Sequence, residues 1–377
     1  PAAAGSSDRR RNANECFGAC NKDDNPWQLS GGDIKWYTDW LAVRGVNLFI
    51  PHAFYYSIRG KRKDERPPDV GPHSIWWAHY DAWSTYWRRL SWLMTDIDLH
   101  AETAVLCRNR DLCPDTVRPL FERQIGFQYI PESYFPACTV EDGALWLHGH
   151  RYTAVLGDKA LFPDAAHPEV SALEPDCRCD PPQPMLRCAS FNKEGRACWL
   201  LVNEGNTPIK TRLTLPVDAP LCRYDLWSGQ PCACPAERTA KGACLPLELP
   251  ARGSLLLFTC TARESEALPL PPTYLSLAAP AFALADEDAA HLTKTYRATL
   301  QITATELQTA TPLLTLPGQE MAELTVNGQP AGVSFWPPHK FPLAGLLTPG
   351  ENTLTLTLTG SPANRYGSHP VPYGLER

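Results

Sequence analysis

One stretch constrains the fold of this chain more than any other, and it runs from Asn14 to Ser57 as NECFGACNKDDNPWQLSGGDIKWYTDWLAVRGVNLFIPHAFYYS. Apolar side chains recur at helical spacing between Ile34 and Val43, which predicts a helix. Ser30 or Asp33 stands where a helix N-cap is expected, and Gly45 supplies a C-terminal stop. The stretch therefore contains a helix with recognisable signals at both ends.

A short, almost entirely apolar run, 46–50, follows the predicted helix. Such a run is typical of a parallel strand that is buried on both faces. His52, Phe54, Tyr55 and Tyr56 come directly after it. A helix that leads into a buried strand with polar and aromatic residues at its end indicates one step of a (β/α) barrel, where the strand ends carry the chemistry.

The rest of the chain changes character once. An α/β rhythm continues through apolar strands expected at 103–107 and 127–130, with a helix expected at 116–125. From about residue 185 the sequence turns all-β, and hairpin turns are expected at 193–195 and at Asn327–Gly328. The order predicts an α/β part followed by β-sandwich units.

Three segments carry a resemblance to known enzymes: ECFGA, DIKWYTDWLAVRGVNLFIPHAFYYSIRG and ERPPDVGPHSIWW. They resemble the catalytic-barrel end of bacterial glycoside hydrolases related to the α-L-rhamnosidases of glycoside hydrolase family 106. The segments VNGQPAG, WPPHKFPL and LLTPGENTLTL resemble the galactose-binding-like sandwich of family 2 enzymes. The resemblance covers about residues 13–156 and 320–375.

This resemblance implies a multidomain fold that combines α/β and all-β parts. The expected order is the C-terminal portion of a (β/α)8 barrel, a truncated flavodoxin-like α/β segment, a small β-sandwich and a galactose-binding-like β-sandwich. Their expected ranges are 1–100, 101–165, 185–262 and 270–377. The first residue is Pro1 and no apolar signal core follows it, so we expect the C-terminal part of a longer enzyme.

Composition excludes several classes of partner. The formal net charge of −6 and the pI near 6.0 argue against nucleic-acid binding. No apolar run reaches the ~18 residues of a membrane span. The 14 cysteines lack the spacing of a zinc site, so we expect scattered free thiols and neither a metal nor another cofactor. The expected partner is a carbohydrate substrate.

Glu15 is the one catalytic candidate. Glycosidases use two carboxyl groups that flank the scissile bond. Glu15 matches the glutamate of the family's strand-end motif, and the resemblance implies that it acts as a base toward water. The partner acid lies on an earlier barrel strand in such enzymes, outside this sequence. The alternative is an exposed glutamate near the N-terminus without a catalytic role.

Seven further residues are candidates for substrate binding. Six of them lie at the predicted strand end or in and after the loop that follows it, and the seventh follows the glutamate motif. A histidine there can bond a sugar hydroxyl, an arginine can clamp it, and aromatic rings can stack on the apolar face of a pyranose. Each has a structural alternative, as a core histidine, a surface arginine or a helix anchor. The candidates are His52, Tyr55, Tyr56, Arg59, Trp76, Trp77 and Trp27.

The sequence therefore predicts a glycoside hydrolase that cleaves a terminal glycosidic bond, with rhamnosidase-like or galactosidase-like specificity. The alternative is a non-catalytic carbohydrate-binding or architectural protein, because the sequence offers one candidate carboxylate rather than two. A metal-dependent hydrolase is disfavoured because His52, His73 and His79 lack an HExxH spacing.

Overall fold

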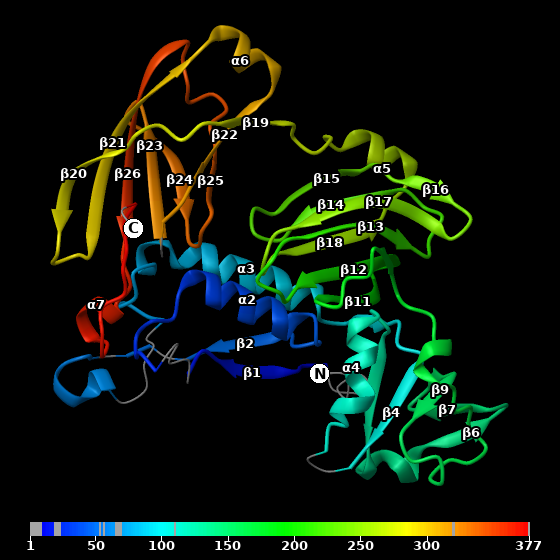
Figure 1. Ribbon diagram of the computed structural model, residues 1–377. Coiled ribbons are helices and arrows are strands. Elements are labelled where there is room, and N and C mark those ends of the chain that lie inside the picture. The colour runs from blue at the N-terminus through cyan, green and yellow to red at the C-terminus, as the bar shows by residue number, and fades with distance from the viewer. Residues whose placement is uncertain are drawn as a thin grey trace. The chain divides into compact units, whose positions relative to one another are not determined.

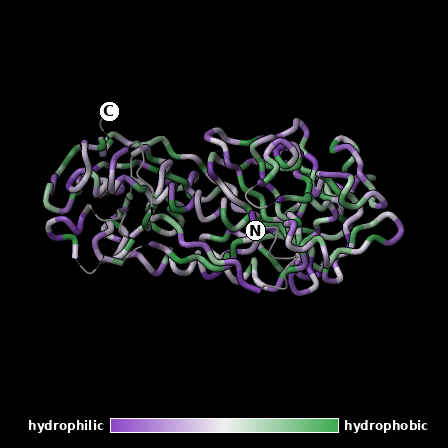
Figure 2. The backbone as a smooth tube through the Cα atoms, turned by 90° about the horizontal axis from the view of Figure 1, so that it is seen from below, coloured by the Kyte–Doolittle hydropathy of each residue, from purple (hydrophilic) through white to green (hydrophobic). Residues whose placement is uncertain are grey.

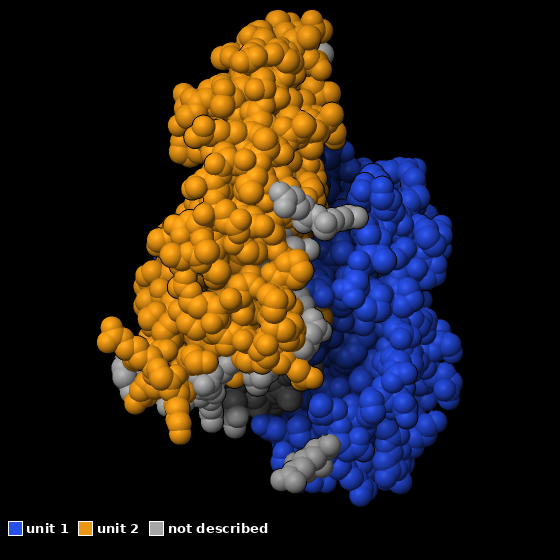
Figure 3. All heavy atoms as spheres, turned by 60° about the vertical axis from the view of Figure 1, so that its left-hand side comes forward, with its two compact units in different colours: residues 1–14, 38–49, 84–271 blue, residues 15–37, 50–83, 272–377 orange. Residues whose placement is uncertain are grey.

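We analysed a computed structural model of the chain, which describes residues 10–18, 24–52, 54–55, 57–64, 70–108, 111–318 and 321–375. The described chain is rich in strands, and its elements are labelled in Figure 1. It forms two compact units, coloured separately in Figure 3. The first unit comprises residues 1–14, 38–49 and 84–271, and the second comprises 15–37, 50–83 and 272–377.

A two-stranded sheet is formed by β1 (Ala13–Cys16) and β2 (Leu48–Pro51). Leu48 N–H donates to Asn12 O at 3.2 Å, and His52 N–H donates to Cys16 O at 2.8 Å, so the two strands run parallel. Across the described ranges no closed barrel is formed, because β1 and β2 pair only with each other. For the same reason the expectation that both faces of this run are buried is wrong. Leu48 and Ile50 are exposed, and only the opposite face is covered, through Phe49.

Helix α2 (Gly31–Ala42) lies between β1 and β2 in the sequence, and helix α3 (Tyr80–Leu93) follows β2. The predicted cap of α2 is confirmed. Asp33 N–H donates to Ser30 Oγ at 3.1 Å, while the Asp33 carboxylate accepts from the Ser30 N–H at 3.2 Å. Ser30 and Asp33 therefore satisfy each other's backbone donors at the helix start. Farther along, buried Thr38 on α2 accepts a hydrogen bond from Trp87 Nε1 at 3.1 Å.

The α/β segment lies in the first unit. Its parallel sheet has the order β5–β4–β9, from β4 (Thr103–Cys107), β5 (Phe127–Pro131) and β9 (Ala154–Leu156), with α4 (Pro114–Glu122) between β4 and β5. Between β5 and β9 the chain forms a small antiparallel sheet instead of a second helix. The strands of that sheet are β6 (Thr139–Glu141), β7 (Ala144–Leu147) and β8 (His150–Tyr152).

A β-sandwich completes the first unit. One sheet has the order β10–β13–β17–β16 and the other β15–β14–β18–β12–β11–β3. Leu213 and Leu245 from the first sheet share one core with Trp199 and Leu257 from the second, so the sheets pack face to face. The predicted turn at 193–195 is confirmed, because Lys193 pairs with Arg196 across it. The strands are β3 (Asp98–Leu99), β10 (Arg178–Asp180), β11 (Leu186–Lys193), β12 (Arg196–Asn203), β13 (Ile209–Leu215), β14 (Leu221–Asp225), β15 (Gln230–Cys234), β16 (Glu237–Thr239), β17 (Gly242–Leu249) and β18 (Ser254–Thr259), followed by helix α5 (Ala262–Ala267).

The second unit contains another sandwich. Its sheets have the orders β20–β21–β26–β23–β24 and β19–β22–β25, and Leu314 and Leu356 contribute to their common core. The hairpin at Asn327–Gly328 is confirmed by the pairing of Val326 with Gln329. The elements are β19 (Tyr274–Leu277), β20 (Ala283–Asp288), β21 (Thr293–Ile302), α6 (Ala304–Thr309), β22 (Thr311–Leu316), β23 (Met321–Val326), β24 (Gln329–Ser334), β25 (His339–Pro342), β26 (Gly350–Thr359) and α7 (Ala363–Tyr366).

Hydropathy changes over short distances along the whole chain, and Figure 2 shows hydrophobic and hydrophilic stretches in quick succession. Strand β26 is an example, because Leu354, Leu356 and Leu358 are buried and point to the core side of its sheet. None of the helices in the described ranges is both long enough and apolar enough to cross a membrane.

Candidate functional site

Glu15 and His52 stand at the ends of the two parallel strands. Glu15 is the third residue of β1 and is exposed, while its neighbour Cys16 is buried, as expected for side chains that alternate across a strand. His52 follows β2, and its N–H bonds to Cys16 O at 2.8 Å. The carboxyl ends of β1 and β2 therefore bring an acidic residue and an imidazole to the same edge of the sheet.

His52 is held closely by the backbone after β1. A Cβ atom on Gly18 would lie 2.9 Å from His52 Cγ, which is closer than such atoms approach, so this position requires glycine. The ring of His52 is half-buried and meets Tyr55 edge to face, with ring centroids 6.4 Å apart. Its Nδ1 is buried and has no hydrogen-bond partner among the described residues. A buried imidazole nitrogen without a partner is uncommon, and it leaves one donor or acceptor of His52 unsatisfied at this strand end.

Trp27 packs against the residues that follow β2. It is only 2% exposed, its Nε1 donates to Lys63 O at 2.9 Å, and its ring meets Tyr55 edge to face at 6.1 Å. A side chain buried to this degree offers no open ring face to a sugar. The structure therefore places Trp27 as an anchor for Tyr55, whereas Tyr56 lies outside the described residues.

The two tryptophans of the predicted stacking pair have different environments. Trp76 is 3% exposed and packs against Trp83 on α3, with ring centroids 6.3 Å apart. This environment is that of a helix anchor, the structural alternative for this residue. Trp77 is 40% exposed and has partners that the sequence analysis did not single out for binding. The ring centroids of Phe54 and Tyr80 lie 5.9 and 5.2 Å from that of Trp77, and Phe54 itself is 51% exposed.

We call Phe54, Trp77 and Tyr80 the aromatic cluster. Burial raises the pKa of Tyr80, and the thiol of Cys16 adds a smaller contribution in the same direction, so Tyr80 lies near the end of β1. The cluster presents open ring surface at this strand end, which suits the C–H face of a pyranose. One signal in the sequence could have identified Phe54, namely its position between His52 and Tyr55 after the apolar run.

The remaining candidate is Arg59, which is exposed and whose N–H donates to Ser57 Oγ at 3.2 Å. In the part of the chain that the structure describes, no three side chains among histidine, cysteine, aspartate and glutamate are grouped to hold a metal ion. The chemistry available here is therefore one exposed carboxylate, one imidazole and open aromatic surface. This combination can bind a hydroxylated ring and accept a proton from water or a hydroxyl group.

A second feature, in the first unit, is a cavity of about 430 Å³ that Asp176 and Gly126 line. Asp176 Oδ2 is buried without a hydrogen-bond partner among the described residues. Burial raises the pKa of Asp176 to about 8, and Glu102 adds to the rise, while a hydrogen bond from Gly126 opposes it. A Cβ on Gly126 would lie 2.5 Å from the main-chain oxygen of His100 and 2.7 Å from Asp176 Oδ2, so glycine is required at this position.

This carboxyl group makes stability depend on pH in a predictable direction. The folded chain holds the proton of Asp176 more tightly than the unfolded chain, whose aspartates titrate near pH ~4. The free energy of unfolding should therefore fall as the pH rises from about 4 to about 8. Asp176→Asn should flatten this slope in urea unfolding measured between pH 4 and 9. Asp142→Asn, a change at an exposed turn, is the control, and an unchanged slope in Asp176→Asn would contradict this assignment.

The comparisons with known proteins bear on the fold. No family model matches the sequence, and no curated protein matches it either. A rhamnosidase from Novosphingobium sp. PP1Y matches the structure with a TM-score of 0.66 and 13% identity, over 97% of this chain and 45% of that chain. The chain thus spans less than half the length of that enzyme.

Two further structures match smaller parts. A β-galactosidase from Bacillus circulans sp. alkalophilus has a TM-score of 0.36 and 10% identity, over 61% of this chain and 52% of that chain. A catalytic mutant of Gan42B, a GH42 β-galactosidase from G. stearothermophilus, has a TM-score of 0.37 and 10% identity, over 61% and 51%. The match to the rhamnosidase shows that the chain shares the fold of the corresponding part of that enzyme.

Proposed function

We propose that this chain forms part of a glycoside hydrolase that cleaves a terminal glycosidic bond, with rhamnosidase-like or galactosidase-like specificity. The observation that carries the proposal is the pairing of β1 with β2, which brings exposed Glu15 and half-buried His52 to the same strand end. The similarity of the fold to a rhamnosidase supports it.

In the proposed mechanism Glu15 is one of the two carboxylates, and it takes a proton from the attacking water. His52 would bind a sugar hydroxyl or orient Glu15, with Tyr55 holding the imidazole ring edge to face. The aromatic cluster would stack on the sugar, and Arg59 would contact its polar rim. The second carboxylate would come from another barrel strand of the longer enzyme to which we propose this chain belongs.

A second candidate, a carbohydrate-binding protein without turnover, is favoured by one observation. The open rings of Phe54 and Trp77 offer a stacking surface whether or not Glu15 is catalytic. The two functions are separated by one assay, in which the longest natural chain that carries this sequence is offered aryl rhamnosides and aryl galactosides. Release of the aryl alcohol that depends on Glu15 supports the hydrolase. Sugar binding without any release supports the binding protein.

A further inference from the structure

A groove of about 540 Å³ lies in the first unit between α3 and the sandwich sheet that contains β11, β12, β14 and β18. Its floor is apolar and includes Tyr224, Leu256 and Phe258. Trp92 of α3 forms part of its wall and is 56% exposed, which is unusual for so large an apolar ring. The groove thus offers apolar surface to a small molecule.

The charged residues of this groove are mostly cations. Arg88, Arg89, Lys193 and Arg196 line it together with a single carboxylate, Glu194. Arg196 is neutralised by two hydrogen bonds to Glu264, at 2.6 and 3.1 Å. The other three cations form no ion pair with any carboxylate that the structure describes, although the whole chain carries a formal net charge of −6. The groove is therefore locally basic on an acidic protein.

Lys193 is the most informative residue of the groove, because a lysine side chain is rarely buried and this one is only 8% exposed. Its Nζ donates to Thr95 O at 2.6 Å and lies 4.6 Å from the ring centroid of Trp92. Thr95 follows the last turn of α3. The helix dipole places a partial negative charge of about half an elementary charge at this C-terminal end. The carboxylate of Asp96 interacts electrostatically with Lys193, but it is itself paired with Arg10 at 2.6 Å. An ammonium group has three donors, and burying its charge without a dedicated counter-ion is costly.

Arg88 and Arg89 add to this charge. Arg89 donates only to main-chain oxygens of the turn after β14, such as Leu226 O at 3.0 Å. Arg88 is exposed and donates to Thr85 Oγ1 at 2.9 Å, which leaves most of its guanidinium donors open. Neutral oxygen atoms satisfy donors without cancelling the charge, so an anion bound here would meet three cations.

We propose that this groove binds a small amphiphilic anion, an apolar or aromatic body with one acidic head group such as a carboxylate. The head group would pair with Lys193 and Arg88, and the body would lie against Trp92 and Phe258. A charge-assisted contact to a guanidinium or ammonium group is about twice as strong as a neutral hydrogen bond, so the head group gives most of the selectivity. This inference is independent of the glycosidase proposal, because it concerns a different part of the chain.

The test is calorimetric titration of the full chain with 2-naphthoate and with its neutral counterpart, 2-naphthamide. We expect 2-naphthoate to bind at one site at least tenfold more tightly than the amide, and to weaken as salt is added. Lys193→Met, which keeps the apolar stem, should weaken 2-naphthoate binding at least tenfold and leave amide binding unchanged. Lys210→Met, at an exposed lysine paired with Glu248, is the matched control and should bind like the wild type.

Arg88→Gln is the second variant, because its exposed side chain can be changed without disturbing the core. It should weaken 2-naphthoate binding several-fold even if Lys193→Met proves not to fold. Three outcomes would overturn the inference. The first is no binding of 2-naphthoate, and the second is equal binding of the acid and the amide. The third is wild-type affinity for 2-naphthoate in every variant that folds, whether Arg88→Gln alone or both Arg88→Gln and Lys193→Met.

Discussion

Glu15→Gln should lower turnover of aryl glycosides by about 10²- to 10⁴-fold, the usual contribution of a general base. Glutamine keeps the shape of the side chain but cannot accept a proton from water. Because Glu15 is exposed at the end of β1, the free energy of unfolding should change by less than ~0.5 kcal/mol. The assay compares initial rates of the longest natural chain and its variant at saturating substrate.

Glu141→Gln is the matched control for this experiment, since Glu141 is also an exposed glutamate on a strand, β6. It should keep wild-type turnover. If Glu15→Gln kept wild-type turnover as well, Glu15 would be an ordinary surface residue.

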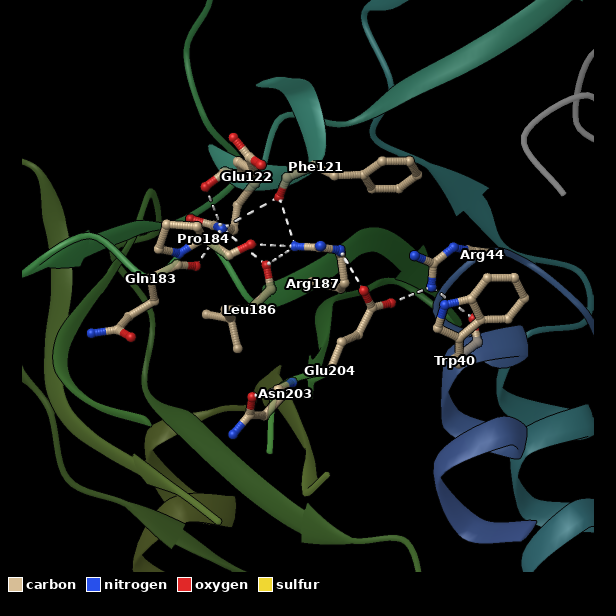
Figure 4. Close-up of polar contacts among 12 residues, drawn as sticks. Trp40, Arg44, Phe121, Glu122, Gln183, Pro184, Leu186, Arg187, Asn203 and Glu204 are labelled. Carbon is tan, nitrogen blue, oxygen red and sulfur yellow. Dashed lines mark hydrogen bonds and ion pairs between the residues drawn. The ribbon is translucent and has the colours of Figure 1, made fainter. Parts of the chain in front are cut away.

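The second large effect concerns stability and the ion pairs shown in Figure 4. Glu204, which follows β12, lies between Arg44 and Arg187, and all three side chains are largely buried. Arg187 Nε lies 2.9 Å from Glu204 Oε2, and both guanidinium groups lie over the ring of Phe121, at 5.0 and 5.5 Å. Burial lowers the pKa of Arg187, and Glu204 opposes that shift. The carboxylate therefore compensates two buried cations.

Glu204→Gln should destabilise the first unit by about 3–5 kcal/mol, because removing one partner of a buried pair leaves charge uncompensated. Urea unfolding, followed by circular dichroism, measures this loss. Glu248→Gln removes a carboxylate from an exposed pair with Lys210 and should cost ~1 kcal/mol or less. Equal losses in the two variants would show that the buried arrangement contributes nothing beyond a surface pair.

Local signals predicted local structure well. The Ser30–Asp33 cap, the turn before Arg196 and the hairpin at Asn327–Gly328 are all present, because each depends on neighbouring residues alone. The strand at 46–50 shows the limit of such reasoning. Its apolar run indicated burial on both faces, but burial depends on which strands lie beside it, and the described chain supplies only β1.

The sequence indicated a strand end after Glu15 and another before His52, but it did not specify that β1 and β2 pair side by side, as their hydrogen bonds show. The different exposures of Trp76 and Trp77 could not be predicted, because they depend on which ring faces Trp83 after folding. Lys193 is a similar case. A lysine beside a turn is expected in water, yet the end of α3, distant in sequence, covers it.

The most direct test of the central claim is a crystal structure of the longest natural chain soaked with rhamnose or galactose. We predict a sugar ring at the ends of β1 and β2, with a hydroxyl within hydrogen-bond distance of His52 and the Glu15 carboxylate facing the anomeric carbon. The rings of Phe54 and Trp77 should lie against the sugar. A sugar bound elsewhere, with this strand end left empty at saturating concentration, would contradict the account.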